Sequence, residues 1–491
     1  MSDSTTDVPA HVDETPLPLD TTSAITTTTT ATSASRQKSL HIAPMLHVST
    51  TEFRNFLRIL TKQAVLWNEM VVDETICFNP EQRDHHLGMT SREAPVVCQI
   101  GGIDTKYTAA ATRIILNDYS EYSEINLNMD CPSSRVSGRK FGAILMKDVD
   151  TAVEILRTMQ QEISSTINTK IQVSVKCRVG IDELDSMEFM VELITKLSQV
   201  TSRFYLHARK CLLEGLSPKE NRLVPPLNYP RVYELCRRFP QCEFYINGGI
   251  PGLQACKELL YGVPPSDNNN NNQHQVPCSI CNVPNGSCTA PPNQVPPNLM
   301  GCMLGRAAMD HPAQFWDVDR YLYGCPSNPC PNRRQLLESY CQYLERVYPR
   351  RCCDDDDRVT MRIPSPPNLV HHSPWCPHYK ENSKCHGNNS NKSSNKSKTK
   401  TTTIKISSCV MDRCFKPVYG VFFGIPGSRT FRRAIDVNSR DQKRRNCGPA
   451  FLLRKAMQVM PSELLDQPFC DTEELGDSIP VHVSPPAPCS C

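Results

Sequence analysis

Short apolar runs alternate with amphipathic stretches in the middle of the chain, and the alternation predicts a repeated order of strand and helix. The apolar runs have the length of short strands, and polar or glycine-containing segments follow several of them. Each run is too short for a helix of ordinary length, which supports the strand assignment. The predicted strands are residues 96–100, 124–128, 171–176, 203–208 and 243–248.

The stretches between these strands repeat their apolar residues with helical spacing, most clearly in residues 151–163 and 186–200. The apolar residues that share one face of the second stretch are Phe189, Leu193, Ile194 and Leu197. Strand and helix alternate over about 250 residues, a length that suits a barrel. We therefore predict an α/β fold, a (β/α)8 TIM barrel, followed by a small C-terminal all-helical domain that begins with the amphipathic stretch 333–350.

Four segments have compositions that cannot bury enough apolar surface to offset the entropy of ordering. The first is rich in Thr and Ser, the second contains a run of asparagines among prolines, and the third combines an aspartate run with an NKSSNKSKTKTTT stretch. We expect all four to be disordered: 1–39, 263–297, 350–408 and 461–491. The predicted domains are therefore a catalytic barrel at 40–324 and a helical domain at 331–460.

Charge is distributed unevenly along the 491 residues, although 54 Lys and Arg against 51 Asp and Glu leave a net of only +3. Residues 411–460 contain 11 Lys and Arg and 3 Asp and Glu, a net of +8, so the rest of the chain carries −5. A uniformly basic coat is excluded, but a local basic module is typical of proteins that bind a phosphate backbone. A solvated helix face is the alternative.

The 25 cysteines are an odd number, and the first ten residues, MSDSTTDVPA, lack the basic and apolar parts of a signal peptide. We therefore expect a reducing compartment, the cytoplasm, with an organelle left open. No apolar run of about 18 residues is present, so no membrane association is expected.

The segment EINLNMDCPSSRVSGRKFGAILM, residues 124–146, is the most informative motif. A strand ends in Cys131-Pro132, and a polar loop with a glycine follows. In a barrel, the carboxyl ends of the strands hold the active site. A thiol there can act as a nucleophile or a proton donor, and the alternative is a packed cysteine beside a turn proline.

Other polar or glycine-containing motifs also end predicted strands. Glycines allow close backbone approach to a ligand, and the guanidinium of Arg306 is a fork-shaped cation suited to phosphate. Neither a G-x-G-x-x-G motif nor a P-loop is present, so a bound flavin mononucleotide (FMN) fits better than a resident dinucleotide. Alone, each motif is equally consistent with a solvated rim or a packed core group. The motifs are QIGG (99–102), VKCRVGID (175–182), LHARK (206–210), INGGI (246–250) and LGR (304–306).

Two groups of Cys and His in the predicted inserts have spacings that could bind zinc. They are Cys278-x-x-Cys281 with Cys288, and Cys376-x-His378 with Cys385-His386. The alternative, scattered thiols in proline-rich filler, is favoured because the first group has no fourth ligand at a regular spacing. We therefore predict no metal site.

Taken together, the motifs resemble those of the tRNA-dihydrouridine synthases, and of the A-type subfamily in particular. The resemblance covers about residues 41–262, 298–349 and 409–460. Its most specific part is the long LSPKENR…PPLNYPRVY block, which no glycine motif matches in length. The other matching stretches are IAPMLHVSTTEFRNFLRIL, NLNMDCPSSRV with FGAILM, VKCRVGIDELDS, LHARKCLLEG, INGGI, LGRAAMDHP and GVFFGIPGSRTFRR.

The resemblance implies an enzyme that uses FMN, with NADPH as the reductant, to reduce the C5–C6 double bond of a uridine in the tRNA D-loop, U20 or U20a. It also implies a monomeric protein with tRNA as its partner. Two alternatives are a tRNA-binding protein without catalysis and an FMN barrel that acts on a free pyrimidine. The basic C-terminal module argues against the latter, because a small substrate does not need it.

The resemblance assigns roles residue by residue. Cys131 would be the proton donor. The residues that would contact FMN are Ala43, Pro44, Met45, Gln99, Lys176, His207, Asn247, Gly248, Gly249, Gly305 and Arg306. The residues that would contact tRNA are Asn128, Lys219, Arg222, Arg429 and Arg432.

The chain departs from the family at two places. Asp130 precedes the cysteine where the family usually has glycine. A carboxylate there should raise the pKa of the Cys131 thiol and repel phosphates. Leu46-His47-Val48-Ser49 replaces an Asp-Trp-Thr-like run, so the contacts made near the flavin are expected to differ there.

Overall fold

The computed structural model describes residues 37–132, 141–166, 170–262, 295–349, 408–445 and 447–469. Most of the segments predicted to be disordered, and all the Cys and His residues of the possible zinc groups, lie outside the described residues. Within the described part of the chain, no helix is both long and apolar enough to cross a membrane.

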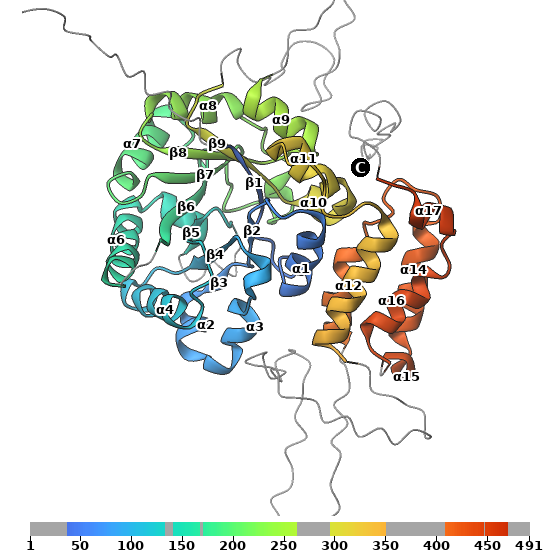
Figure 1. The fold of residues 1–491 in the computed structure, drawn as a ribbon. Coiled ribbons are helices and arrows are strands. Elements are labelled where there is room, and N and C mark those ends of the chain that lie inside the picture. The colour runs from blue at the N-terminus through green and yellow to red at the C-terminus, as the bar shows by residue number, and fades with distance from the viewer. Residues whose placement is uncertain are drawn as a thin grey trace, which may run out of the picture. The chain divides into compact units, whose positions relative to one another are not determined.

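The predicted barrel is confirmed. A parallel sheet runs in the order β1-β9-β8-β7-β6-β5-β4-β2, and β3 also pairs with β4. Val65 closes the ring beside β1, because its N–H donates to the Leu40 carbonyl at 2.8 Å and its carbonyl accepts from the Ile42 N–H at 2.9 Å. Helices surround the strands (Figure 1). The strands are β1 (Ser39–Ile42), β2 (Leu66–Trp67), β3 (Val71–Val72), β4 (Val96–Gly101), β5 (Glu124–Met129), β6 (Gln172–Arg178), β7 (Arg203–His207), β8 (Glu243–Asn247) and β9 (Leu299–Leu304).

Helices and 3-10 turns connect the strands, and several of the longer helices begin at a side-chain cap. Asp104, Ser186 and Asn228 each accept a hydrogen bond from a backbone N–H of the first turn. The α-helices are α1 (Thr51–Leu60), α2 (Asp73–Phe78), α3 (Arg83–Leu87), α4 (Thr105–Asp118), α6 (Val149–Ser165), α7 (Met187–Leu197), α8 (Tyr229–Arg238), α9 (Leu253–Tyr261), α10 (Arg306–Asp310) and α11 (Val318–Tyr323). The 3-10 helices are η1 (Pro80–Gln82), η2 (Ser91–Glu93), η3 (Gly142–Met146), η4 (Glu220–Arg222) and η5 (Pro312–Asp317).

The core has two parts, one on each side of the sheet. The larger lies between the strands and the helices, and the smaller fills the barrel interior around Trp67, Tyr205 and Tyr245. Three of the four residues predicted on the apolar face of α7 are buried: Leu193, Ile194 and Leu197. The fourth buried residue is Met190, however, and Phe189 is only half-buried.

The C-terminal segment is helical, as predicted, and α16 packs against both α12 and α14. Its contact with the barrel is built on Glu52, which is buried in α1. The carboxylate of Glu52 pairs with Arg413 at 3.0 Å and accepts a hydrogen bond from the Tyr348 hydroxyl at 2.5 Å. The elements are α12 (Arg333–Val347), α13 (Ser408–Phe415), η6 (Lys416–Val418), α14 (Ser428–Arg440), α15 (Gln442–Arg445), α16 (Pro449–Met457) and α17 (Ser462–Asp466).

The structure describes ordered residues as far as 469, whereas the sequence predicts a disordered tail from residue 461. Helix α17 follows, and Asp466 forms an ion pair with Arg334 of α12. Phe469 then stacks on Trp316 with ring centroids 5.5 Å apart. An aromatic side chain with a partner of this size is sufficient to hold a short terminal segment, which explains the difference.

Candidate functional site at the carboxyl ends of the strands

The predicted site residues come together at one end of the barrel because they occupy matching positions on neighbouring strands. Asn128 of β5 pairs in register with Lys176 of β6. His207 of β7 pairs with Arg178 of β6 on one side and with Asn247 of β8 on the other. Cys131 lies two residues after the end of β5 and is half-exposed. The strand register therefore places the proposed proton donor and the proposed cofactor contacts at the same level, the mouth of the barrel.

Asp130 is the centre of the charged part of this mouth. Its carboxylate forms ion pairs with the Lys176 ammonium and with Arg178, whose Nε lies 2.5 Å from Asp130 Oδ1. The same oxygen lies 3.2 Å from His207 Nδ1. The Asp130 side chain is 17% exposed, whereas those of its three partners are 7% exposed or less. We call these four residues the Asp130 cluster.

The protonation states within the cluster follow from its geometry. Burial alone would raise the pKa of Asp130, but the charges of Lys176 and Arg178 hold it well below its ordinary value. Burial, together with the charge of Arg178, lowers the pKa of His207 to about 3. His207 is therefore neutral near pH 7, and its Nδ1–H donates to Asp130. One carboxylate against two cations leaves the cluster with a net charge of +1.

A series of amide side chains holds the backbone at Cys131. The Asn128 carbonyl oxygen accepts from the Cys131 N–H at 3.1 Å, and the Asn128 amide donates to Gln99 at 3.0 Å. Gln99 in turn donates to Asn126 at 2.9 Å. Asn126 donates to Ser174 at 2.6 Å, and the Ser174 hydroxyl donates to the buried carboxylate of Glu124. Gln99 and Asn128, expected to contact FMN and tRNA, thus also brace the Cys131 backbone.

The hydroxyl of Ser49 holds the loop Ala43–Met45. Ser49 is one of the four residues, Leu46 to Ser49, that replace the family's usual run. Ser49 donates to the Ala43 carbonyl and accepts from the Met45 N–H, both at 3.0 Å. A Cβ at Gly305 would lie 3.5 Å from Met45 Sδ, so the β9 end packs against this loop. A Cβ at Gly248, which has φ 113°, would lie 2.6 Å from the His207 ring. Glycine is therefore required at position 248.

An excess of positive charge lies beside the glycines. Arg306 donates to the Arg222 carbonyl at 3.3 Å, and burial together with the charge of Arg306 lowers the pKa of Arg209. Among the described residues, no carboxylate forms an ion pair with any of these three arginines, and the buried Arg209 Nε has no hydrogen-bond partner. An anion such as a phosphate would satisfy them. Arg209 is absent from the predicted site, although its place in LHARK, two residues after a strand-end histidine, is the signal that could have identified it.

The other predicted tRNA contacts lie on exposed surface. Lys219 and Arg222 are exposed at η4. Arg429 and Arg432 are exposed on α14 together with Arg433, and Arg432 Nε donates to the Tyr419 carbonyl at 2.7 Å. Within the described ranges, no carboxylate pairs with any of these three α14 arginines.

The second departure from the family also has a defined geometry. His47 has φ 59°, its N–H donates to Glu69, and its carbonyl accepts from Lys416 of η6 at 2.6 Å. Its neighbour Leu46 is 62% exposed. The loop Leu46–Ser49, where the sequence differs from the family, therefore connects the barrel mouth with the helical segment.

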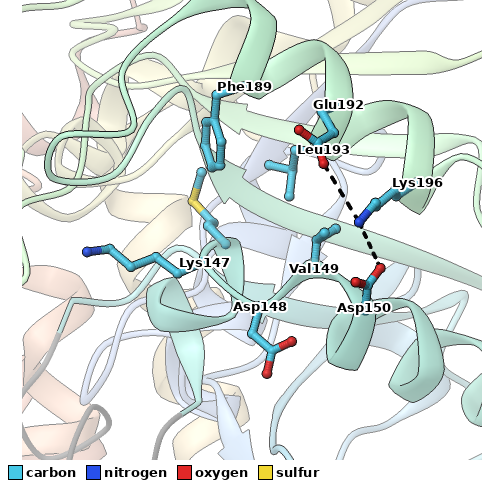
Figure 2. A pocket seen from close by; sticks show the side chains of 9 residues that line it. Lys147, Asp148, Val149, Asp150, Phe189, Glu192, Leu193 and Lys196 are labelled. Atoms are coloured by element: carbon cyan, nitrogen blue, oxygen red, sulfur yellow. Dashed lines mark hydrogen bonds and ion pairs between the residues drawn. The ribbon is translucent and has the colours of Figure 1, made fainter.

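A cavity of about 210 Å³ lies elsewhere, between α7 and the start of α6. Figure 2 shows Lys196 placed between Glu192 and Asp150, and the Lys196 ammonium is 2.9 Å from Asp150. Lys147 pairs with Asp182 at 2.9 Å. Because the cations lining it already have carboxylate partners and no strand end reaches it, this cavity is not the functional site.

A closed parallel barrel with a thiol, a carboxylate-paired cation cluster and arginines at the carboxyl ends of its strands has the architecture of the barrel enzymes, whose active sites lie at that end. Comparison with known proteins then narrows the class. Residues 41–262 match the family described as "Dihydrouridine synthase (Dus)".

Relatives in three organisms are named "tRNA-dihydrouridine(20/20a) synthase". The Yersinia pestis protein is 35% identical over 307 residues, which cover 62% of this chain and 75% of the relative. The Salmonella typhi protein is 41% identical and the Synechocystis sp. protein 36%, each covering 62% of this chain and 78% of the relative. The chain belongs to the dihydrouridine synthase family of enzymes.

Among solved structures, a variant of NCR from Zymomonas mobilis matches with a TM-score of 0.27 and 11% identity, over 42% of this chain and 73% of that one. This likeness is too weak to support an argument about fold or function. The dihydrouridine synthases are flavoenzymes, and the donor set at the mouth suits a flavin with a phosphate. It combines a cluster of net charge +1, glycines that leave space, and arginines that have no carboxylate partner among the described residues.

Proposed function

We propose that this chain is an A-type tRNA-dihydrouridine synthase that reduces the C5–C6 double bond of the D-loop uridine at position 20 or 20a, with FMN as its cofactor and NADPH as its reductant. The names of its relatives support the substrate and the position. The observation that supports the proposal is the register of β5, β6 and β7, in which Asn128 pairs with Lys176 and Arg178 pairs with His207 at the strand ends, with Cys131 two residues after β5.

FMN, when bound, would supply the two electrons of the reduction. The residues proposed to hold it are those at the strand ends around the Asp130 cluster. Arg306 and the neighbouring Arg209 would meet the phosphate, because they lack carboxylate partners among the described residues. Ala43, Pro44 and Met45 would line the ring, with Gly248, Gly249 and Gly305 giving the space that side chains would occupy.

Cys131 is proposed to deliver the proton that C5 of the uracil needs. A general acid must carry a proton at the working pH, and an ordinary cysteine thiol does, with a pKa of roughly 8.5. The neighbouring Asp130 cannot take this role, because its ion pairs hold its pKa well below the ordinary value. The hydrogen bond from the Cys131 N–H to Asn128 would fix the position of the proton donor.

The tRNA is proposed to lie across the barrel mouth and the exposed arginines of α14. The target uridine must leave its stack to reach the mouth, at a cost of a few kcal/mol. Backbone phosphate contacts by Lys219, Arg222, Arg429 and Arg432 would offset that cost.

The test uses the whole chain, purified, with the chromophore released by acid and identified. NADPH is then supplied with either unmodified tRNA or free uridine, and dihydrouridine is mapped in the product. We expect FMN, and dihydrouridine at position 20 or 20a of the tRNA only. Reduction of free uridine but not tRNA would favour the free-pyrimidine enzyme, and tRNA binding without flavin would favour the binding protein.

A further inference from the structure

Asp130 places a carboxylate among the cations of the site, at a position where the resemblance leads us to expect glycine. Its oxygens contact Lys176 and Arg178 and accept from His207, so it engages three groups from two neighbouring strands. Without this carboxylate the same groups would carry a net charge of +2 rather than +1, because His207 is neutral.

Arg178 and the end of β5 have contacts that do not depend on the Asp130 carboxylate. Arg178 also donates to the main-chain carbonyls of Asn221 at 3.0 Å and Lys210 at 3.4 Å. The end of β5 is held by Asn128, which accepts from the N–H groups of both Asp130 and Cys131. The arrangement of the strand ends thus has its own hydrogen bonds, and the distinctive contribution of Asp130 is its charge.

From this geometry, and resting on the proposed function, we propose that Asp130 is a positioning residue that sets the reduction potential of the bound flavin, by offsetting the charge of Lys176 and fixing the proton of His207 on Nδ1. Two-electron reduction adds negative charge to a flavin, so a more positive site favours the reduced form. By offsetting one of two cations, Asp130 keeps the bound flavin harder to reduce and therefore a stronger donor of electrons.

The tautomer of His207 is the second consequence. Because Nδ1 carries the hydrogen that Asp130 accepts, Nε2 holds a lone pair and can only accept a hydrogen bond. His207 Nε2 lies beside the backbone of Gly248, 3.0 Å from where a Cβ would stand. The ring therefore presents an acceptor, not a donor, to a ligand at the glycine turn.

The experiment measures the reduction potential of FMN bound to the whole chain, with a reference dye, in the parent and in Asp130→Gly and Asp130→Asn. We expect the equilibrium constant for reduction to rise at least tenfold in both variants, which is about 30 mV for a two-electron couple. Sulfite, which adds an anionic group to oxidised flavin, should also bind at least tenfold more tightly.

Two controls separate charge from structure. Asp130→Glu retains the charge and should keep a potential close to that of the parent. Glu183→Gln removes one negative charge from an exposed side chain that pairs with Lys147, outside the cluster, and should leave the potential unchanged. Thermal unfolding is measured for every variant, and Asp130→Asn, which keeps the shape of the side chain, provides the result if Asp130→Gly does not fold.

The outcomes distinguish this inference from the proposed function. A parent protein that binds no flavin contradicts the proposed function itself. A parent that binds FMN, with Asp130→Asn and Asp130→Gly at the parent potential and the parent sulfite affinity, overturns the role of Asp130 and leaves the proposed function standing.

Discussion

The barrel mouth and the exposed face of α14 both concentrate positive charge, but they hold it in opposite ways. At the mouth, Lys176 and Arg178 are almost fully buried, and a single carboxylate, Asp130, engages both. On α14, Arg429, Arg432 and Arg433 are exposed, and no carboxylate among the described residues pairs with them.

The difference shows what each region is suited to bind. Buried cations in fixed ion pairs can hold a small ligand in one geometry, because little solvent screens them and their side chains are already ordered. Exposed arginines adapt to a flexible phosphate backbone and respond to salt. The first arrangement is that of a cofactor and reaction site, and the second that of a surface for a large polyanion.

The largest effect is expected at the mouth. Cys131→Ala should lower turnover by roughly 10²–10⁴-fold, because it removes the proposed general acid. The flavin content and the affinity for tRNA should stay at the parent values, since the thiol is not assigned to bind either. Single-turnover formation of dihydrouridine measures this directly.

Cys325→Ala is the matched control, because Cys325 is also half-exposed but lies after α11, away from the strand ends. Its turnover should equal that of the parent. Undiminished dihydrouridine formation in Cys131→Ala would show that the thiol is not the proton donor. It would also remove the evidence that the barrel mouth is the reaction site and α14 only a binding surface.

The second effect is a loss of tRNA affinity when the arginines of α14 are replaced. Changing Arg429, Arg432 and Arg433 together to alanine should weaken tRNA binding by roughly 10²-fold at 0.15 M salt, and should reduce the slope of log affinity against log salt by about 2 to 3. The flavin potential should not change. Filter binding over a range of salt concentrations measures both quantities.

Arg237→Ala with Arg238→Ala provides the control, because these two exposed arginines on α8 pair with Glu234. They should have little effect on the salt slope. A triple variant with the parent affinity and the parent slope would show that the unpaired arginines of α14 do not contact the phosphates.

A third effect, on stability rather than on turnover or tRNA affinity, distinguishes the regions by pH. Burial, with the charge of Arg203, lowers the pKa of His41 from 6.5 to about 3, and its Nδ1 accepts from the Trp67 indole at 3.1 Å inside the barrel. The unfolded chain then binds this proton more readily than the folded one, so stability is greatest above pH 6.5 and is lost as the pH falls toward 3. Between pH 7 and 5, His41 and His207 should each cost about 2 kcal/mol.

Denaturant unfolding at the two pH values measures this loss, and His41→Gln should reduce it. Equal stability of the parent at pH 7 and pH 5 would contradict the protonation states assigned to the buried histidines.

The fold could be predicted from the sequence because it depends on local patterns. The apolar runs at 96–100 and 203–208 have the length of strands, and the amphipathic stretches between strands have the helical period. Lys176 and His207 could be placed at one end of the barrel because each closes a predicted strand, and the structure brings them together through Asp130.

The remaining features depend on contacts between distant parts of the chain. The pairing of Asp130 with Arg178 requires the register of β5 and β6, and the hydroxyl contacts of Ser49 require the loop to turn back on itself. The ordered end of the chain depends on Phe469 meeting Trp316, 153 residues earlier in the numbering. Neither composition nor periodicity contains this information.

The side chains that connect Cys131 to the barrel floor form hydrogen bonds that all point one way. From the Cys131 N–H through Asn128, Gln99, Asn126 and Ser174, each group donates toward the floor. The last donor, the Ser174 hydroxyl, donates to the carboxylate of Glu124, which when ionised can only accept. If any one of these side-chain amides were rotated by 180°, its NH2 group would face another donor and its carbonyl oxygen would face another acceptor. The acid at the far end of the barrel thus determines the orientation of every amide up to the Cys131 backbone N–H, and a change there should reach the backbone that positions the thiol.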